Sequence, residues 1–312
     1  MIVWLKIVLV VGALVGLLVV VRGLGTRRHW HPEWQRKALH MALGLTATTF
    51  PWLFRAIWPV WTICGAGILI MGSLRYVPMI RRRLGGTLHD VQRDSTGELL
   101  FALAIALLFG LAHTAPVVYV VPLAILTVAD SAAALVGLYG GRNCFATPFG
   151  RKSWEGVAAF VLTALGVTMP LLAWLTPLPW PTLLLVTATV VLLTTLVEAI
   201  AWHGHDNLLI PVAGYLTLTL ALAEPASLLL DHLALFAGVN LLFVPLWQQL
   251  PTHTTLTGLL IFATLWLGGP LLWLAGLLVL LFGRLLRRQQ PHTVVPFRLD
   301  ALPAHFWLAF VG

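Results

Sequence analysis

Apolar runs about as long as a bilayer is thick recur along almost the whole chain. The first covers residues 2–21, which matches the roughly twenty residues that a helix needs to cross the hydrocarbon core. Others lie at 39–54, 57–74, 99–111, 157–175, 208–223, 228–246 and 255–282, and two more carry Asp130 and Glu198. Lipid offers the backbone no hydrogen-bond partners, so only helices or closed barrels can span it. Because barrel strands would alternate over about ten residues, these runs predict an all-α, polytopic transmembrane helical bundle of about 9–10 spans.

Composition and charge agree with a membrane location. Hydrophobic residues make up 59% of the chain and charged residues 10%, whereas a soluble domain carries about a quarter charged residues. The net charge of +8 marks orientation rather than a nucleic-acid partner, because Lys and Arg gather in cytoplasmic loops. With the N-terminus outside, the loops after the first, third, fifth and seventh spans hold nearly all of them up to Gly156. We therefore expect an integral protein of a prokaryotic plasma membrane.

This topology also gathers distant polar residues at one membrane face. They come from the ends of several spans and from the loops between them, and we expect them to form one site on the cytoplasmic side. The residues concerned are Lys37, His40, Asp94, Glu98, Asp130, Lys152, Glu155, Glu198, Asp206 and Asn207.

Asp130 is the most informative of these residues, because an ionised carboxylate inside a span is costly unless it is paired or functional. It could form a structural ion pair with Arg142 or Lys152. Alternatively, it could be a ligand for Mg²⁺ bound to a nucleotide. Gly137 lies two helical turns further on, where a missing side chain allows close backbone approach. Gly140 and Gly141 can simply end the helix.

The segment Lys152-Ser153-Trp154-Glu155-Gly156 begins the next apolar run. Ser153 can be an N-cap and Glu155 can complement the helix dipole, which is a purely structural interpretation. In a functional interpretation, Lys152 and the helix N-terminus bind a phosphate. The pattern differs from the Walker motif, because no Gly-x-x-x-x-Gly-Lys-Ser run occurs here.

Three further groups of polar residues allow two interpretations each. Arg36, Lys37 and His40 share one helix face, where the first two could merely mark orientation. Glu98 starts the fourth span, where acids are favoured in any case. Glu198 lies inside the seventh span, while Asp206-Asn207 could be an ordinary N-cap.

Taken together, these motifs resemble the CTP-dependent polyprenol kinase family, which includes phytol kinase and dolichol kinase and is distantly related to phosphatidate cytidylyltransferase. The resemblance covers roughly residues 36–220 and looks most like phytol kinase. We accordingly expect a first helix and basic loop at 1–35, a catalytic membrane domain at 36–223, and appended helices with a basic tail at 224–312. The matching elements are Arg36-Lys37-x-x-His40, Gly97-Glu98, Asp130-x-x-Ala133-x-x-x-Gly137-x-x-Gly140, Lys152-Ser153-x-Glu155-Gly156, and Glu198 followed by Asp206-Asn207-x-x-x-Pro211.

The resemblance implies transfer of the γ-phosphoryl group of CTP to a long isoprenoid alcohol whose tail stays in the bilayer. Phosphoryl transfer depends mostly on positioning and charge neutralisation. Asp130, with Glu198 or Asp206, would hold Mg²⁺, and Glu98 or Asp206 would orient or deprotonate the alcohol. Lys152 and Arg142 would neutralise the phosphates. The wider set of implied nucleotide contacts is Arg36, Lys37, His40, Gly137, Gly140, Gly141, Arg142, Lys152, Ser153, Glu155, Gly156 and Asn207.

Two other functions remain open on sequence grounds. Phosphatidate cytidylyltransferases share the Asp, Gly and Lys-Ser/Thr-x-Glu-Gly features, but they usually carry a Ser-Pro before the lysine and a fuller acidic pattern. Here the stretch before Lys152 reads Pro148-Phe-Gly-Arg151. A transporter could use the same acids for ion coupling. However, transporters often show inverted repeats and broken helices near the membrane centre, and we find no clear repeat.

Overall fold

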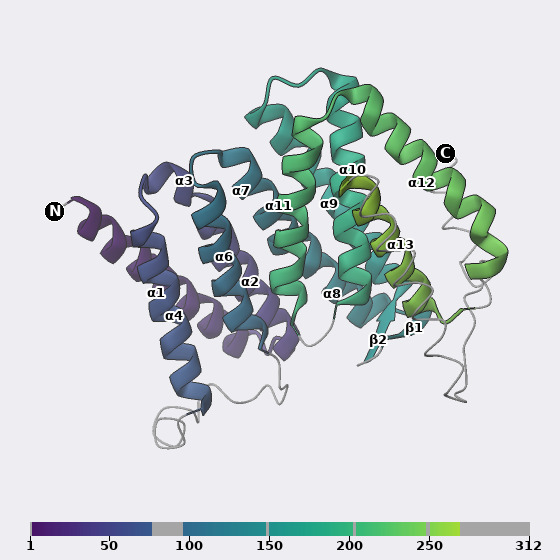
Figure 1. Ribbon diagram of the computed structural model, residues 1–312. Coiled ribbons are helices and arrows are strands. Elements are labelled where there is room, and N and C mark those ends of the chain that lie inside the picture. The colour runs from purple at the N-terminus through teal and green to yellow at the C-terminus, as the bar shows by residue number, and fades with distance from the viewer. Residues whose placement is uncertain (1, 77–95, 148–149, 202–203, 248–249, 269–312) are drawn as a thin grey trace.

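The computed structural model describes residues 2–76, 96–147, 150–201, 204–247 and 250–268, and these are helical apart from one short hairpin and the connections (Figure 1). The first half contains α1 (Ile2–Arg27), α2 (Pro32–Thr48), α3 (Phe50–Leu53), α4 (Trp58–Tyr76), α6 (Gly97–Ala112), α7 (Pro116–Ala124), the π-helical turn η2 (Ile125–Ala129) and α8 (Asp130–Gly140). The second half contains β1 (Cys144–Thr147), β2 (Gly150–Ser153), α9 (Trp154–Leu175), α10 (Trp180–Ile200), α11 (Asp206–Ala223), α12 (Ala226–Trp247) and α13 (Thr252–Gly268).

The prediction of an all-α polytopic bundle is confirmed. Within the described residues, five helical segments are long and apolar enough to cross a membrane: Ile2–Arg27, Pro116–Gly140, Trp154–Leu175, Trp180–Ile200 and Asp206–Ala223. Shorter apolar helices cover Trp58–Gly72, Gly97–Ala112 and Ala226–Gly238. Most of the basic loop expected before Glu98, and the second half of the apolar run at 255–282, lie outside the described residues. The outward orientation of the N-terminus stays a prediction.

The continuous rod of α7, η2 and α8 forms the centre of the bundle. In this rod 67% of the most apolar window is buried inside the protein, against 11% in α1, so α1 is peripheral and the rod is central. Tyr119 and Leu126 are fully buried, and the Tyr119 hydroxyl donates to the Ala47 carbonyl of α2 at 3.0 Å. A helix that is apolar on all sides needs neighbours around it, and this rod contacts α2, α6, α9 and α11.

Small residues let α8 and α9 pack closely. Ala133, Gly137 and Gly141 are spaced four apart on α8 and its C-cap, and Gly156 faces them from the first turn of α9. A methyl group at Gly137 would lie 3.2 Å from Ser153 Oγ, and one at Gly156 would lie 3.0 Å from the Ala133 carbonyl oxygen. Stripes of small residues bring helix backbones together in membrane proteins. These glycines are therefore required for helix packing, whatever else they contact.

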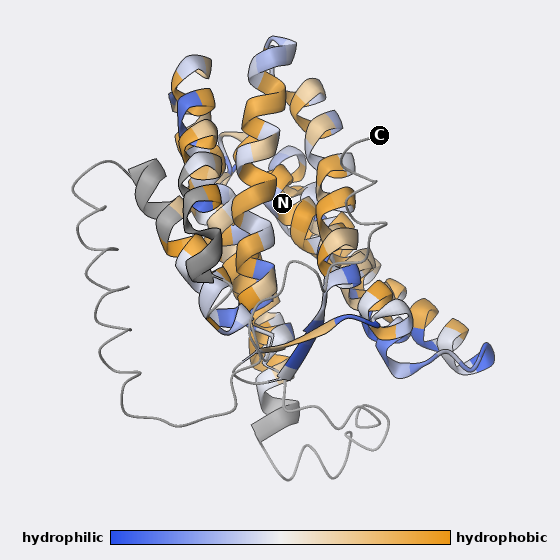
Figure 2. Cartoon of the chain, turned by 90° about the vertical axis from the view of Figure 1, so that its right-hand side faces the viewer, coloured by the Kyte–Doolittle hydropathy of each residue, from blue (hydrophilic) through white to orange (hydrophobic). Residues whose placement is uncertain are grey.

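The basic segment between α8 and α9 folds into an antiparallel hairpin, which the sequence analysis treated as a loop. Phe145 pairs with Lys152 and Cys144 with Ser153. Figure 2 shows helix bodies that are mostly hydrophobic, with a strongly hydrophilic strand at the hairpin. Four-residue strands of mixed composition carry little periodic signal, so the pattern could not distinguish this hairpin from a loop.

Candidate active site

A π-helical turn delivers Asp130 to the site. Pro122 lies inside α7, η2 follows, and the Asp130 backbone amide donates to the Ile125 carbonyl. Such single π turns within α-helices occur frequently at functional sites. On the facing helix α2, a side chain at Gly44 would overlap Thr127 of the π turn. Glycine at this position therefore allows α2 to approach closely enough for its polar residues to reach Asp130.

Asp130 is bound by two residues of α2. Its Oδ2 accepts a hydrogen bond from Lys37 Nζ at 2.6 Å, and the side chains of Lys37 and Asp130 are only 3% and 4% exposed. His40 Nε2 lies 3.9 Å from the same oxygen and 3.3 Å from the Leu126 carbonyl. Arg142 and Lys152 were the structural ion-pair partners expected for Asp130. Those assignments were wrong, because the partner is Lys37, which lies 93 residues away in sequence.

Glu198 forms the second ion pair of the site. Its Oε2 lies 2.8 Å from Lys152 Nζ, and its backbone carbonyl also accepts from the same ammonium group. Glu198 is in the last turn of α10, while Lys152 comes from β2. The Lys152 side chain is 21% exposed and that of Glu198 is 10% exposed. This pair is thus closer to solvent than the pair of Lys37 and Asp130.

Three carboxylates meet between these pairs. One oxygen each from Asp130, Glu198 and Asp206 lies within 4.8 Å of the other two. Carboxylate oxygens are the ligands that Mg²⁺ prefers, at about 2.0–2.1 Å, so ligands on opposite sides of one ion are roughly 4.2 Å apart. Small side-chain movements would bring this trio to such a distance. The donor set therefore fits a divalent cation, and the assignment of these residues as Mg²⁺ ligands stays a prediction.

The charges around the three carboxylates also fit a bound cation. The three carboxylates face two ammonium groups, from Lys37 and Lys152, which leaves the centre one negative charge in excess (three minus two). Like charges at this spacing repel strongly in a medium of low dielectric constant. A cation or a proton relieves that repulsion.

Asn207 connects Asp206 to another part of the bundle. Its Nδ2 donates to the Gly97 carbonyl at the start of α6 at 2.9 Å, and its backbone amide donates to Asp206 Oδ1 at 3.0 Å. The Asn207 side chain is buried. It thereby holds the first turn of α11, and with it Asp206, against α6. The expectation that Asn207 also contacts the nucleotide stays a prediction.

The remaining residues expected at the site lie around this centre. Arg36 binds Glu33 of its own helix at 2.6 Å. Glu98, in the first turn of α6, is exposed and lies outside the carboxylate trio, and Gly140 and Arg142 are exposed as well. Their predicted contacts with substrates stay predictions. Of the two candidates for the residue that orients the alcohol, only Asp206 belongs to the trio.

Ser153 and Glu155 have structural partners. Ser153 is the N-cap of α9 and accepts from the Gly156 amide at 3.1 Å, as the structural interpretation predicted. Glu155 accepts from the Asn143 backbone amide at 3.0 Å and from Asn143 Nδ2 at 2.8 Å. These bonds tie the base of the hairpin to the start of α9, which fixes the strand that carries Lys152. Whether a nucleotide also touches Ser153, Glu155 or the packing glycines is a prediction.

Sequence reasoning did not identify two contributors to the site. Phe101 of α6 lies against the His40 ring, with ring centroids 4.4 Å apart. Gly44 permits the approach of α2 to the π turn. Neither residue differs from its apolar surroundings in the sequence, so no local pattern could have singled them out.

The fold and the site together define a class: a polytopic helical protein with three convergent carboxylates and two lysines beside the π turn of its central rod. Comparison with known proteins narrows this class. The chain is 31% identical to a phytol kinase from Synechocystis sp. over 187 residues, which cover 59% of this chain and 77% of that protein. The chain belongs to the phytol kinase family. No protein-family model matches it, and no solved structure matches it either.

Proposed function

We propose that this protein is an integral membrane kinase that transfers the γ-phosphoryl group of CTP to the hydroxyl of an isoprenoid alcohol such as phytol. The observation that carries the proposal is the carboxylate trio flanked by Lys37 and Lys152, found in a relative of phytol kinase. Phosphoryl transfer needs little covalent participation by the protein, but it needs many charges held in position. A buried centre of acids and lysines meets that need.

We assign Asp130 and Glu198 as the residues that would hold Mg²⁺, since both are buried. When bound, the ion would supply positive charge to the β- and γ-phosphate oxygens. Lys152 is the lysine with access to solvent and is therefore the one that reaches the phosphates. Arg142, exposed at the start of the same segment, adds a second cation there.

Asp206 is our candidate for the group that accepts the proton of the alcohol. It is less buried than Asp130 or Glu198 and stands beside both. In the proposed reaction the alcohol oxygen forms a bond to the γ-phosphorus and the bond from that phosphorus to the β-phosphate oxygen breaks. The hydroxyl proton passes to the Asp206 carboxylate, and CDP leaves.

The proposed site faces the cytoplasm of a prokaryotic cell, with the isoprenoid tail remaining in the bilayer. The positive-inside bias of the loops supports this orientation. An alcohol of this kind would enter sideways between helices and present only its hydroxyl to the carboxylates. The apolar outer faces of the helices would accept such a tail, but they do not discriminate its length.

The test is to incubate the purified protein in detergent with Mg²⁺, with γ-labelled CTP, ATP or UTP, and with phytol, geranylgeraniol or a dolichol. We expect label in an alcohol monophosphate, highest with CTP. A CDP-lipid with release of pyrophosphate would instead indicate a cytidylyltransferase. No turnover with any pair would contradict the kinase. An Asp206→Asn preparation is the matched control, because it changes one atom of the trio and leaves the helices unaltered.

A further inference from the structure

Residues of the C-terminal helices pack on the hairpin that carries Lys152. Helix α13 contacts both α10 and β1. A hydrophobic cluster, separate from the main core, joins Phe145 of β1 to Leu193, Leu196 and Ala199 of α10 and to Leu256 and Ala263 of α13. Phe145 and Leu256 are each 6% exposed. Helix α13 is thus packed against the hairpin that carries Lys152.

The register of the hairpin connects this cluster to Lys152. Phe145 and Lys152 are direct cross-strand partners, and partners in an antiparallel pair project from the same face. Phe145 enters the cluster beside α10, and Lys152 reaches Glu198 at the end of that same helix. The Phe145 ring also lies against Trp154, with centroids 4.9 Å apart. The depth to which Phe145 is buried in the cluster therefore determines the position of Lys152.

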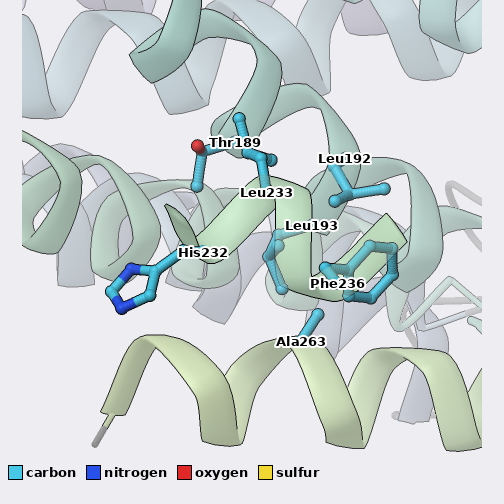
Figure 3. Close-up of a pocket in the computed structure, with 7 residues that line it drawn as sticks. All are labelled: Thr189, Leu192, Leu193, His232, Leu233, Phe236 and Ala263. Atoms are coloured by element: carbon cyan, nitrogen blue, oxygen red, sulfur yellow. The ribbon is translucent and has the colours of Figure 1, made fainter. Parts of the chain in front are cut away.

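The contact between the C-terminal helices and α10 is apolar but not completely filled. A small cavity of about 20 Å³ lies between α10, α12 and α13 (Figure 3), which is room for roughly one water molecule. Leu193 and Ala263, which belong to the cluster with Phe145, also line this cavity. Packing across this interface is the contact that holds α13 against α10 and the hairpin.

We propose that Leu256 is a positioning residue: through Phe145, it holds the hairpin so that Lys152 stays on Glu198. The consequence for catalysis, tighter binding of the nucleotide phosphates by a preplaced lysine, rests on the proposed kinase function. The effect of Leu256 on the position of Lys152 does not depend on that function. Segment 226–268 then belongs to the functional unit, rather than being a separate membrane appendage.

The first measurement is independent of any activity. Competitive acetylation of the folded protein in detergent, followed by mass spectrometry, reports how accessible the Lys152 amine is. We expect Leu256→Ala to raise the labelling rate of Lys152 several-fold and to leave that of Lys37 unchanged. The matched control is Leu229→Ala: Leu229 is a fully buried leucine of α12 in the main core. Equal Lys152 labelling in the two variants would overturn the proposal.

The second measurement is kinetic. Leu256→Ala should raise the KM for CTP about tenfold and change the KM for the alcohol little, because a hole in the cluster misplaces a phosphate ligand rather than the lipid tail. Leu256→Met, which conserves volume, should restore the wild-type KM. A uniform loss of kcat in both Leu256→Ala and Leu229→Ala would mean simple destabilisation and would contradict the positioning role.

The two proposals fail in different ways. If wild-type protein phosphorylates no alcohol, the kinase function is wrong, while the labelling experiment still decides the role of Leu256. If the alanine variants are not recovered in folded form, Leu256→Val and Leu229→Val give the same comparison with a smaller cavity. A double variant, Phe145→Ala with Leu256→Ala, should label no faster than the more affected single variant, because both residues belong to one cluster.

Discussion

The two ion pairs of the site differ in their access to water. Lys37 and Asp130 join α2 to the central rod, with side chains that are 3% and 4% exposed. Lys152 and Glu198 join the hairpin to α10, with side chains that are 21% and 10% exposed. We refer to them as the closed pair and the open pair. Both contribute a carboxylate to the same trio, so one centre combines a pair that is shielded from solvent with one that solvent reaches.

This difference indicates that the two ion pairs have different roles in the site. Separating a buried ion pair leaves an uncompensated charge, which is far more costly than loss of a pair near water. The closed pair is therefore suited to fixing the position of Asp130 in the bundle. The two residues of the open pair can separate and bind other groups. An incoming phosphate can bind the Lys152 ammonium while a metal ion binds Glu198. Variants of each pair should reveal the contrast.

The largest effect is expected from Asp130→Asn. The substitution removes a proposed metal ligand and leaves Lys37 buried without its counter-ion. Breaking a buried pair by removing one partner costs about 3–5 kcal/mol, and loss of a preorganised electrostatic group lowers turnover by about 10²–10³-fold. Thermal unfolding in detergent and the kinase assay should both show the loss.

A companion variant tests whether the closed pair behaves as a unit. Asp130→Asn combined with Lys37→Met removes the buried positive charge as well, so much of the lost stability should return. Activity should not return, because the ligand is still missing. Full activity in Asp130→Asn, or no change in its unfolding temperature, would contradict the role assigned to the closed pair.

An intermediate effect is expected from Lys152→Ala. Turnover should fall by about 10²-fold, since a cation that neutralises phosphate is lost. The free energy of unfolding should fall by about 1–3 kcal/mol, less than for Asp130→Asn, because the Glu198 carboxylate loses its partner at a site that water can partly reach. Initial rates at varied CTP and the unfolding midpoint measure the two quantities. A stability loss as large as that of Asp130→Asn would remove the distinction between the pairs.

The smallest effect is expected from Glu98→Gln, because Glu98 is exposed and lies outside both pairs and the trio. We expect activity within about threefold of wild type, since a single exposed charge contributes little. Asp206→Asn is the isosteric counterpart inside the trio and should lower kcat by about 10²-fold, the lower end of the range for loss of a general base. If the two results were reversed, Glu98 would be the residue that orients the alcohol.

Much of the fold and several site residues were accessible from sequence. Asp130, Glu198 and Asp206 stood out because acids are rare at the ends of apolar runs, and their convergence followed from the order of spans. The helices match the apolar runs because hydropathy over twenty residues is a strong signal. Ser153 was also correctly interpreted as a helix cap, since the preference for serine there is local.

Other features could not be predicted because they depend on contacts between distant segments. Lys37 binds Asp130, a partner 93 residues away that no local pattern indicates. Its predicted contact with the nucleotide stays a prediction. Gly137 was expected to allow close backbone approach, and the structure shows that α9 is what approaches it, with Gly141 and Gly156 in the same contact. The nucleotide contacts of these glycines stay a prediction. A glycine indicates close approach but does not say what approaches.

The sequence by itself determined that the chain is a membrane-embedded helical bundle and which acids are candidates for a site, because long apolar runs and the rare charges within them are recognisable in single segments. Only the tertiary structure decided which lysine neutralises which acid, which pair solvent can reach, and that α13 packs on the hairpin. Those outcomes depend on the rotation and depth of each helix against its neighbours. Rotation and depth are set by packing, which no single segment encodes.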